Sequence, residues 1–335
     1  MRVTISARRA RPTTIEPTVN DEHQKLFDGV MAREPRAIAR AMSRAEGGAD
    51  ADRDLMSAIY AAAGKAHVVG LTGVPGSGKS TMVRALTQRF RADGLTVGII
   101  AIDPSSPFSG GAILGDRVRM GDLAGDDGVF IRSMATRGAL GGLTYGCLEA
   151  VDVLDAAGFD IVMIETVGVG QDEVDIARAA HTVLVVSAPG LGDDIQAIKA
   201  GVLEIADIHV VSKADRADAN KTVADLRGML KVGLSGRSGT GWETPVIPTS
   251  AETGDGIDDL AAKILAHKTH LDDAGGLATR QREIAENRIV KAAERVARKR
   301  VAAARGKGLE AVLDGVSART QDPLSAAAKL MNDGE

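Results

Sequence analysis

Apolar residues recur along this chain with two different spacings, and the change of spacing divides the chain into regions. Between 22 and 64 the apolar positions fall near helical spacing, which predicts amphipathic helices, and Gly47-Gly48 separates two of them. From 67 to 267, short aliphatic and β-branched runs alternate with helical patterns, and beyond 270 only helical spacing remains. The expected strands are His67–Thr72, Thr96–Ile102, Val129–Arg132, Ile161–Ile164, Thr182–Ser187, His209–Val211 and Val246–Pro248.

The alternation of buried strands with helices predicts an α/β fold with a mostly parallel central sheet. Several of the strands are continuous apolar runs, as expected where helices cover both faces of a sheet. We therefore expect a tail over 1–20, an N-terminal helical region over 21–65, an α/β domain over 66–270 and a C-terminal helical arm over 271–335. Because the arm has little core of its own, we expect it to form a homodimer interface.

A glycine-rich loop follows the first expected strand and precedes a helix, and it has the GxxxxGK[ST] pattern of a phosphate-binding P-loop. Its backbone N–H groups would converge on the phosphates, and the positive end of the following helix would add to the attraction. Lys79 would reach the β- and γ-phosphates, and the Ser80 hydroxyl would coordinate Mg²⁺. The sequence thus predicts a P-loop NTPase whose cradle is formed by Gly73, Val74, Pro75, Gly76, Ser77, Gly78, Lys79, Ser80 and Thr81.

Two acids follow expected strands, at the sheet edge where ligands of parallel sheets bind. Asp103 suits an outer-shell Mg²⁺ contact or the activation of water, and the alternative is a carboxylate that satisfies its own turn. Glu165 follows the run that ends at Ile164, and Gly168 comes three residues later. This arrangement links Mg²⁺ to a loop that senses the γ-phosphate and moves when it leaves. Because Val169 rather than glutamine follows Gly168, we expect slow unaided hydrolysis.

The segment Ser212-Lys213-Ala214-Asp215 follows the strand that ends at Val211 and predicts the identity of the base. The Asp215 carboxylate can accept two hydrogen bonds from guanine, which adenine cannot supply, and the Lys213 stem can cover the base. Ser212 occupies a position where asparagine is usual. A later loop, Ser250-Ala251, would face the guanine oxygen, so the expected nucleotides are GTP and GDP.

Composition narrows the function classes. The net charge of −4 and the aromatic content of 2% give no reason to expect nucleic-acid binding. The single cysteine, Cys147, excludes an internal disulfide framework and fits a reducing compartment. No apolar run approaches the length of a membrane span.

Arginines in the first fifteen residues suggest either a transit peptide or a basic tail, and we favour a tail on a cytoplasmic protein. Basic residues beside the apolar stripe of the arm are expected to form a solvated flank.

Together these segments resemble the MeaB/ArgK family, the G proteins associated with methylmalonyl-CoA mutase. The resemblance covers the whole α/β region and depends on specific motifs. They are GVPGSGKS (73–80), AIDPSSP (101–107), GDRVRM (115–120), IRSMATRGALGG (131–142), ETVGVGQDE (165–173), SAPGLGDDIQAIKAG (187–201) and VSKAD (211–215).

The resemblance implies a homodimeric GTPase that binds adenosylcobalamin-dependent methylmalonyl-CoA mutase, gates cofactor loading and protects the mutase from inactivation. By position, Asp103, Asp116 and Glu165 would be the acids of the Mg²⁺ and switch region. A further switch would transmit the nucleotide state to the mutase, and its residues would be Gly190, Asp193, Asp194, Gln196 and Lys199.

Two other activities use the same loop. A kinase that phosphorylates a protein or small molecule needs an acceptor pocket and a base, and the segment 103–145 could contain both. Asp215 and Ser250-Ala251 argue against it, since most kinases use ATP. A nickel-insertion GTPase is disfavoured because the six histidines are scattered and only one cysteine is present.

Overall fold

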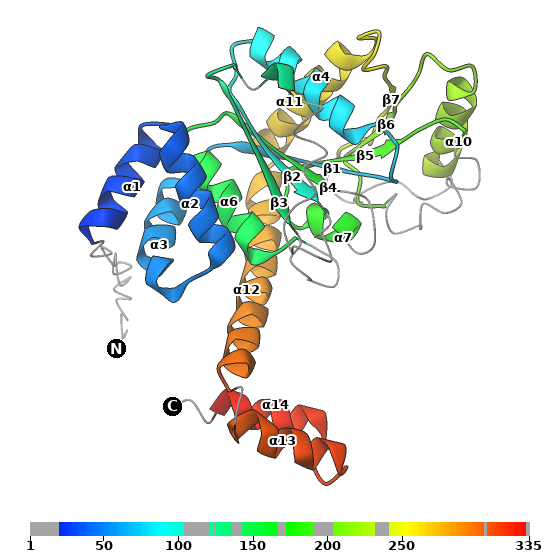
Figure 1. Ribbon diagram of the computed structural model, residues 1–335. Coiled ribbons are helices and arrows are strands. Elements are labelled where there is room, and N and C mark those ends of the chain that lie inside the picture. Colours follow the sequence, from blue (N-terminus) through cyan, green and yellow to red (C-terminus); the bar gives the residue numbers. More distant parts are fainter. Residues whose placement is uncertain are drawn as a thin grey trace, which may run out of the picture.

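The computed structural model describes residues 20–103, 121–123, 125–135, 143–166, 172–190, 204–231, 241–304 and 307–332. Within them seven strands form one sheet in the order β3-β2-β4-β1-β5-β6-β7 (Figure 1). Every pairing between neighbours is parallel, so the predicted α/β fold with a parallel central sheet is confirmed. The strands are β1 (His67–Thr72), β2 (Val97–Asp103), β3 (Val129–Ala135), β4 (Ile161–Thr166), β5 (Thr182–Ser187), β6 (Ile208–Val211) and β7 (Val246–Pro248).

Several strands extend beyond the apolar runs that predicted them, and two of the extensions include acids. Glu165 lies inside β4, opposite Leu71 of β1 and Ala101 of β2, whereas we predicted that it follows the strand. Asp103 is likewise the last residue of β2 rather than the first of a loop. The reason is that neighbouring strands on both sides of β4 continue its hydrogen-bond ladder past the apolar run. The two acids are therefore positioned by strand backbone.

One face of the sheet shares its core with the N-terminal helices. These are α1 (Asp21–Met31), α2 (Pro35–Gly47), the short η1 (Asp50–Asp52) and α3 (Arg53–Ala62), and they pack around α6 (Tyr145–Ala156) (Figure 1). Fully buried apolar residues join them to the sheet in a single cluster, including Val30, Ile38, Met42, Leu55 and Ile59. The predicted break at Gly47-Gly48 corresponds to the end of α2, where Gly48 adopts φ +63° as the C-cap.

The opposite face is covered by α4 (Lys79–Ala92) and α11 (Ile257–Asp273), which bury Met82, Leu86, Phe90 and Leu260 against the sheet. Two further helices lie beside the strands: α7 (Asp172–Ala177) follows β4, and α10 (Ala219–Lys231) precedes β7. The sheet is thus enclosed on both faces, as its apolar strands require.

The C-terminal helices extend away from the sheet. The long α12 (Gly276–Ala303) passes beside α6 and leads to α13 (Lys307–Ser317) and α14 (Pro323–Asn332) at its far end (Figure 1). Its apolar stripe is exposed, with Ile289 70% and Val296 47% accessible. The basic side of α12 is not the solvated flank that we expected. Four of its cations form ion pairs with acids of α6, α7 and η1, because α12 lies across the acidic surface of those helices. No helix among the described residues combines the length and apolar composition needed to cross a membrane.

A chain of buried polar groups lies where the strands begin. The His67 imidazole and the Thr182 hydroxyl are 2.8 Å apart, and the same hydroxyl is 2.8 Å from His267 Nδ1. Asp207 continues the chain by accepting hydrogen bonds from Arg280 of α12 at 2.8 Å. His181 Nδ1 accepts a hydrogen bond from the backbone N–H of Val68 at 3.0 Å, which requires a neutral ring. Burial lowers the pKa of His67 to about 2 and that of His181 to about 4.

These histidines predict a loss of stability in acid. The folded pKa of His181 lies below the ordinary value of 6.5, so the unfolded chain binds more protons as the pH falls below that value. Between pH 7 and pH 5 this difference lowers the free energy of unfolding by about 2 kcal/mol. Urea denaturation at pH 7 and pH 5 measures this loss of unfolding free energy in the wild type and in His181→Asn. Asparagine keeps an acceptor at this position but cannot be protonated. Equal losses in the two proteins would exclude His181 as the cause.

Candidate functional site

The loop between β1 and α4 has the backbone that a phosphate cradle requires. Gly73 has φ +136°, and a Cβ there would lie 2.1 Å from the carbonyl oxygen of Val186 on β5. Gly76 and Gly78 have φ +77° and +88°, a region that side-chain-bearing residues rarely adopt. The loop therefore curls tightly over the carboxyl end of the sheet only because glycine occupies these positions.

Lys79 and Ser80 begin α4 and are both buried. The Lys79 ammonium donates to the carbonyl oxygens of Gly73 at 2.8 Å and Val74 at 3.1 Å, so it lies folded back along the loop. The Ser80 hydroxyl donates to Glu165 Oε1 at 2.6 Å. A cation and a hydroxyl are thus placed at the positive end of a fourteen-residue helix, where phosphate oxygens bind favourably.

Glu165 brings a carboxylate from β4 against the first turn of α4. It is only 4% exposed, and its backbone is fixed by the ladders on both sides. The pair formed by the Ser80 hydroxyl and the Glu165 carboxylate offers two oxygen donors close together. Such oxygens suit Mg²⁺, which usually takes one or two protein ligands in addition to phosphate and water. The donor set present therefore fits this ion.

The segment 212–215 is fastened to the phosphate loop. The Ser212 hydroxyl lies 2.5 Å from the carbonyl oxygen of Ser77 and 3.0 Å from that of Ser187. Lys213 adopts φ +53°, and its ammonium donates to the carbonyl oxygen of Gly76 at 2.9 Å. Ser212 thus provides a mechanical link between the two loops at the position where asparagine is usual.

Asp215 and Ser250 meet at the outer end of this segment. Asp215 is exposed, and the hydrogen bond from the Ser250 hydroxyl lowers the pKa of the Asp215 carboxyl. The backbone holds the two loops together, since Ala214 N–H donates to the carbonyl oxygen of Thr249 at 2.9 Å. Ala251 follows directly and is half-buried. An ionised acceptor therefore faces outward beside the phosphate loop, where a base would lie.

Several predicted site residues lie outside the described part of the chain. They are Asp116, Gly168, Asp193, Asp194, Gln196 and Lys199, and the side chain of Asp103 is also outside it. Gly190 is described and has φ +84°, with the Asp218 carboxylate 3.2 Å from the position of a Cβ. Thr81 is exposed on the first turn of α4. The structure thus brings together the cradle, Glu165 and the segment around Asp215.

Sequence reasoning missed Ser187, whose carbonyl oxygen accepts hydrogen bonds from both the backbone and the hydroxyl of Ser212. Ser187 is the last residue of β5, and that position at the carboxyl edge of the sheet was the available signal.

A parallel sheet with a P-loop after its central strand, and a second loop with an outward carboxylate fastened to it, defines a P-loop NTPase of the G-protein type. Comparison with known proteins gives the family. Residues 35–307 match the family described as "Methylmalonyl Co-A mutase-associated GTPase MeaB". The chain therefore belongs to this family of GTPases.

Individual relatives agree with this assignment. A protein of Pyrococcus horikoshii, named as a GTPase, is 44% identical over 303 residues, which cover 90% of this chain and 95% of the relative. The mouse protein named "Methylmalonic aciduria type A homolog, mitochondrial" is 37% identical over 216 residues, covering 64% of this chain and 52% of the relative. A crystal structure described as a LAO/AO transport system kinase aligns with a TM-score of 0.68 at 27% identity, covering 93% of this chain and 98% of that one.

Proposed function

We propose that this protein is a GTP-hydrolysing chaperone that binds adenosylcobalamin-dependent methylmalonyl-CoA mutase, gates loading of the cofactor and protects the mutase from inactivation. The family description, which names association with that mutase, supports the choice of partner. The name of the mouse relative points to the same area of metabolism. The observation that carries the nucleotide assignment is the link between the segment bearing Asp215 and the phosphate loop through Ser212.

In this proposal the base and the phosphates are bound by adjoining loops. The Asp215 carboxylate accepts hydrogen bonds from guanine, the Lys213 stem covers the base, and Ser250-Ala251 faces the guanine oxygen. The backbone of 73–78 surrounds the phosphates, and Lys79 leaves the Gly73 and Val74 carbonyls to reach the β- and γ-phosphates. Because Ser212 and Lys213 fasten the loops together, the distance between the two binding regions is preset.

Hydrolysis depends on the residues beside the γ-phosphate. Ser80 would hold Mg²⁺ directly, with Glu165 beside it and with Asp103 and Asp116 as further acids of this region. The bound ion supplies neutralisation of the phosphate charge. Glu165 accepts the Ser80 hydroxyl hydrogen bond and so orients its oxygen. The Gly168 N–H would approach the γ-phosphate. Departure of that phosphate after hydrolysis would free the loop that contains Gly168.

Communication with the mutase is assigned to the segment that contains Gly190, Asp193, Asp194, Gln196 and Lys199. We propose that it follows β5 as a switch that transmits the nucleotide state. We further divide the chain into a tail (1–20), N-terminal helices (21–65), a GTPase domain (66–270) and a dimerisation arm (271–335).

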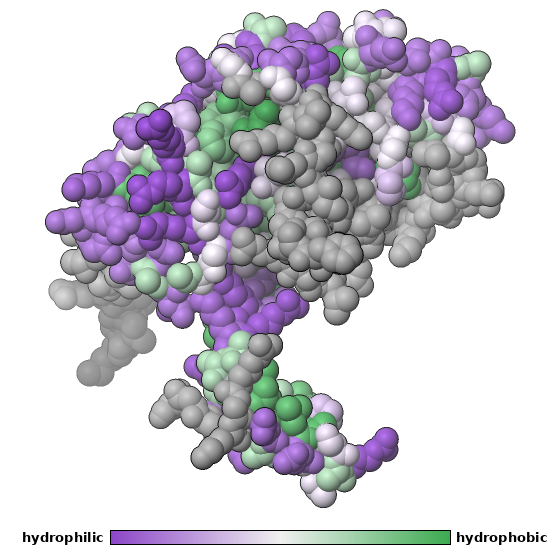
Figure 2. Space-filling model, in the orientation of Figure 1, coloured by the Kyte–Doolittle hydropathy of each residue, from purple (hydrophilic) through white to green (hydrophobic). Residues whose placement is uncertain are grey.

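The arm supports the proposed homodimer because several of its large apolar side chains are exposed in the described part of the chain. Leu313 is 51% and Leu324 81% exposed, and Figure 2 shows hydrophobic residues gathered over the C-terminal helices at the bottom of the view. A second copy of the chain would bury such a surface.

Mixing the purified protein with a methylmalonyl-CoA mutase tests the proposal. We expect GTP turnover by the protein alone to be well below about 1 s⁻¹, because Val169 rather than glutamine follows Gly168, and to rise when the mutase is added. The rate of phosphate release measures this. Serum albumin in place of the mutase, and the variant Lys79→Ala with the mutase, serve as controls. A rate unchanged by the mutase would contradict the chaperone assignment.

The alternative function is a P-loop kinase, and the solved relative described as a kinase gives it a concrete basis. It predicts GTP-dependent transfer of labelled phosphate to a protein or small-molecule acceptor. Labelled inorganic phosphate as the sole product favours the GTPase chaperone instead.

A further inference from the structure

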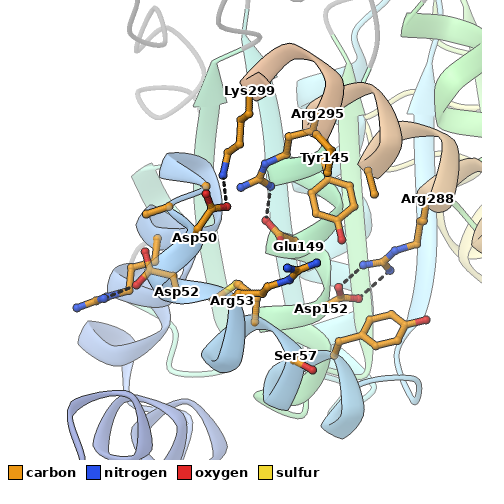
Figure 3. A pocket seen from close by; sticks show the side chains of 17 residues that line it. Asp50, Asp52, Arg53, Ser57, Tyr145, Glu149, Asp152, Arg288, Arg295 and Lys299 are labelled. Atoms are coloured by element: carbon orange, nitrogen blue, oxygen red, sulfur yellow. Dashed lines mark hydrogen bonds and ion pairs between the residues drawn. The ribbon is translucent and has the colours of Figure 1, made fainter. Parts of the chain in front are cut away.

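Four basic residues of α12 occupy one side of the helix, and we call them the α12 joint: Arg288, Lys291, Arg295 and Lys299. Their spacing of three, four and four residues places them one above the other. Each pairs with an acid of another element. Arg288 binds Asp152 and Arg295 binds Glu149, both on α6, while Lys291 binds Asp175 on α7 and Lys299 binds Asp50 on η1. Figure 3 shows three of these pairs around a shared hollow.

The hollow at the joint has a volume of about 320 Å³, and the residues of the joint that line it are already paired with acids. Each of the three basic residues of the joint that line it has an acid within hydrogen-bond distance: Arg288 to Asp152 at 2.9 Å, Arg295 to Glu149 at 3.0 Å and Lys299 to Asp50 at 2.6 Å. Paired charges leave little field to recruit a charged ligand. The arrangement is therefore better explained as a joint between α12 and the rest of the protein than as a binding pocket.

The ion pairs of the joint differ in burial, and burial determines how much free energy is lost when each pair is separated. The side chains of Lys299 and Asp50 are 40% and 89% exposed, so water screens this pair and it contributes little. Those of Lys291 and Asp175 are only 18% and 17% exposed. Separating the second pair would leave two largely buried charges without a partner, which is costly.

Asp175 belongs to a helix that adjoins the nucleotide site. Five residues, 167–171, separate α7 from the end of β4, which carries Glu165. The helix also rests on β1, because Ile176 is fully buried and its Cγ1 would lie 2.6 Å from a Cβ at Gly70, three residues before the phosphate loop. Directly after α7, the carbonyl oxygen of Arg178 accepts a hydrogen bond from Asn287 of α12 at 3.3 Å. α7 thus contacts the strand that leads into the cradle on one side and α12 on the other.

We propose that the Lys291–Asp175 pair couples the position of α12 to the nucleotide state. The inference rests on the proposed binding of GTP at the cradle. Two pairs hold α12 to α6 and one holds it to α7. A shift of α7 relative to α6 must therefore either carry α12 with it or break a largely buried ion pair. The arm is the element that would form the dimer, so this pair gives the nucleotide a route to the subunit interface.

Amide hydrogen exchange of peptides from α12 tests the coupling in the full-length protein, with Mg²⁺ and either GDP or a non-hydrolysable GTP analogue. We expect wild-type exchange to differ between the two nucleotides by about threefold or more, the size expected when one partly buried ion pair is gained or lost. In Lys291→Ala and Asp175→Asn the difference should fall below about 1.5-fold, because the link is removed. Exchanging the charges, with Lys291→Asp and Asp175→Lys together, should restore it.

Lys299→Ala is the matched control, since it removes an exposed pair of the same joint that does not touch α7. It should keep the wild-type difference. Equal exchange in both nucleotides despite measured binding, or a difference that survives in Lys291→Ala, would overturn the coupling while leaving the proposed function intact. Failure to bind either nucleotide in calorimetric titration would overturn the proposed function and the coupling with it.

Discussion

Replacing Lys79 by alanine is expected to lower kcat/KM for GTP by about 10²–10³-fold, the usual effect of removing one charge-stabilising group from a phosphoryl-transfer site. The residue is 6% exposed, and its ammonium lies within the phosphate loop, bound to two of the carbonyl oxygens. Lys213 is not placed to substitute for it there, since its ammonium is held at the outer side of the loop by the carbonyl oxygen of Gly76. Phosphate release under saturating and limiting GTP separates the loss of binding from the loss of turnover.

The effect of Lys79→Ala on the stability of the fold should be small compared with its effect on turnover. Removing the ammonium leaves the Gly73 and Val74 carbonyls without that donor, which costs about 1 kcal/mol of stability. A thermal melt of Lys79→Ala therefore checks that the protein remains folded. Lys221→Ala, which removes an exposed lysine of α10, is the matched control and should behave as the wild type. Wild-type turnover in Lys79→Ala would exclude the loop as the site of hydrolysis.

Changing Asp215 to asparagine is expected to shift the base preference from guanine to xanthine. The carboxylate is exposed, and the Ser250 hydrogen bond keeps the pKa of its carboxyl low, so it acts purely as an acceptor. An amide presents a donor in its place, which repels the guanine amino group and suits the C2 oxygen of xanthine. We expect GTP affinity to fall, and xanthosine triphosphate affinity to rise, each by about a hundredfold or more.

Two variants make this result specific. Asp225→Asn alters an exposed acid of α10 away from the loops and should leave both affinities unchanged. Ser250→Ala removes the hydrogen bond that holds the Asp215 carboxylate and should weaken GTP binding less, about tenfold or below, without creating affinity for xanthosine triphosphate. If Asp215→Asn still prefers GTP as the wild type does, another residue reads the base.

Local sequence patterns were sufficient for the fold and for the phosphate loop. The parallel sheet could be predicted because its strands are short apolar runs separated by helical patterns. The bounds of β1, β5 and β7 agree with those predictions, because each run begins and ends abruptly. The cradle was predictable because Gly73, Gly76 and Gly78 adopt backbone conformations that few other residues tolerate.

Features that depend on neighbouring elements could not be predicted in this way. The position of Glu165 inside β4 follows from the ladders of β1 and β2, which the residues around Glu165 do not encode. Ser212 departs from the usual asparagine, and only the structure shows its hydroxyl bound to the Ser77 and Ser187 carbonyls.

The basic side of α12 illustrates the same limit. Taken alone, its arginines and lysines indicate a solvated surface, because charged helix faces usually contact water. Their acidic partners lie between 116 and 249 residues away in the sequence, on α6, α7 and η1. Only the packing of α12 against those elements reveals that these charges form an internal joint.

The central claim is that one phosphate cradle, fastened to an outward carboxylate, selects guanine nucleotides. Calorimetric titration of the wild-type protein with GTP and with ATP, each with and without Mg²⁺, tests it most directly, and the Asp215→Asn titrations serve as its internal reference. We predict that GTP binds about a hundredfold or more tighter than ATP, and more tightly with Mg²⁺ than without it. Equal affinity for the two nucleotides, or GTP binding that Mg²⁺ leaves unchanged, would contradict the account.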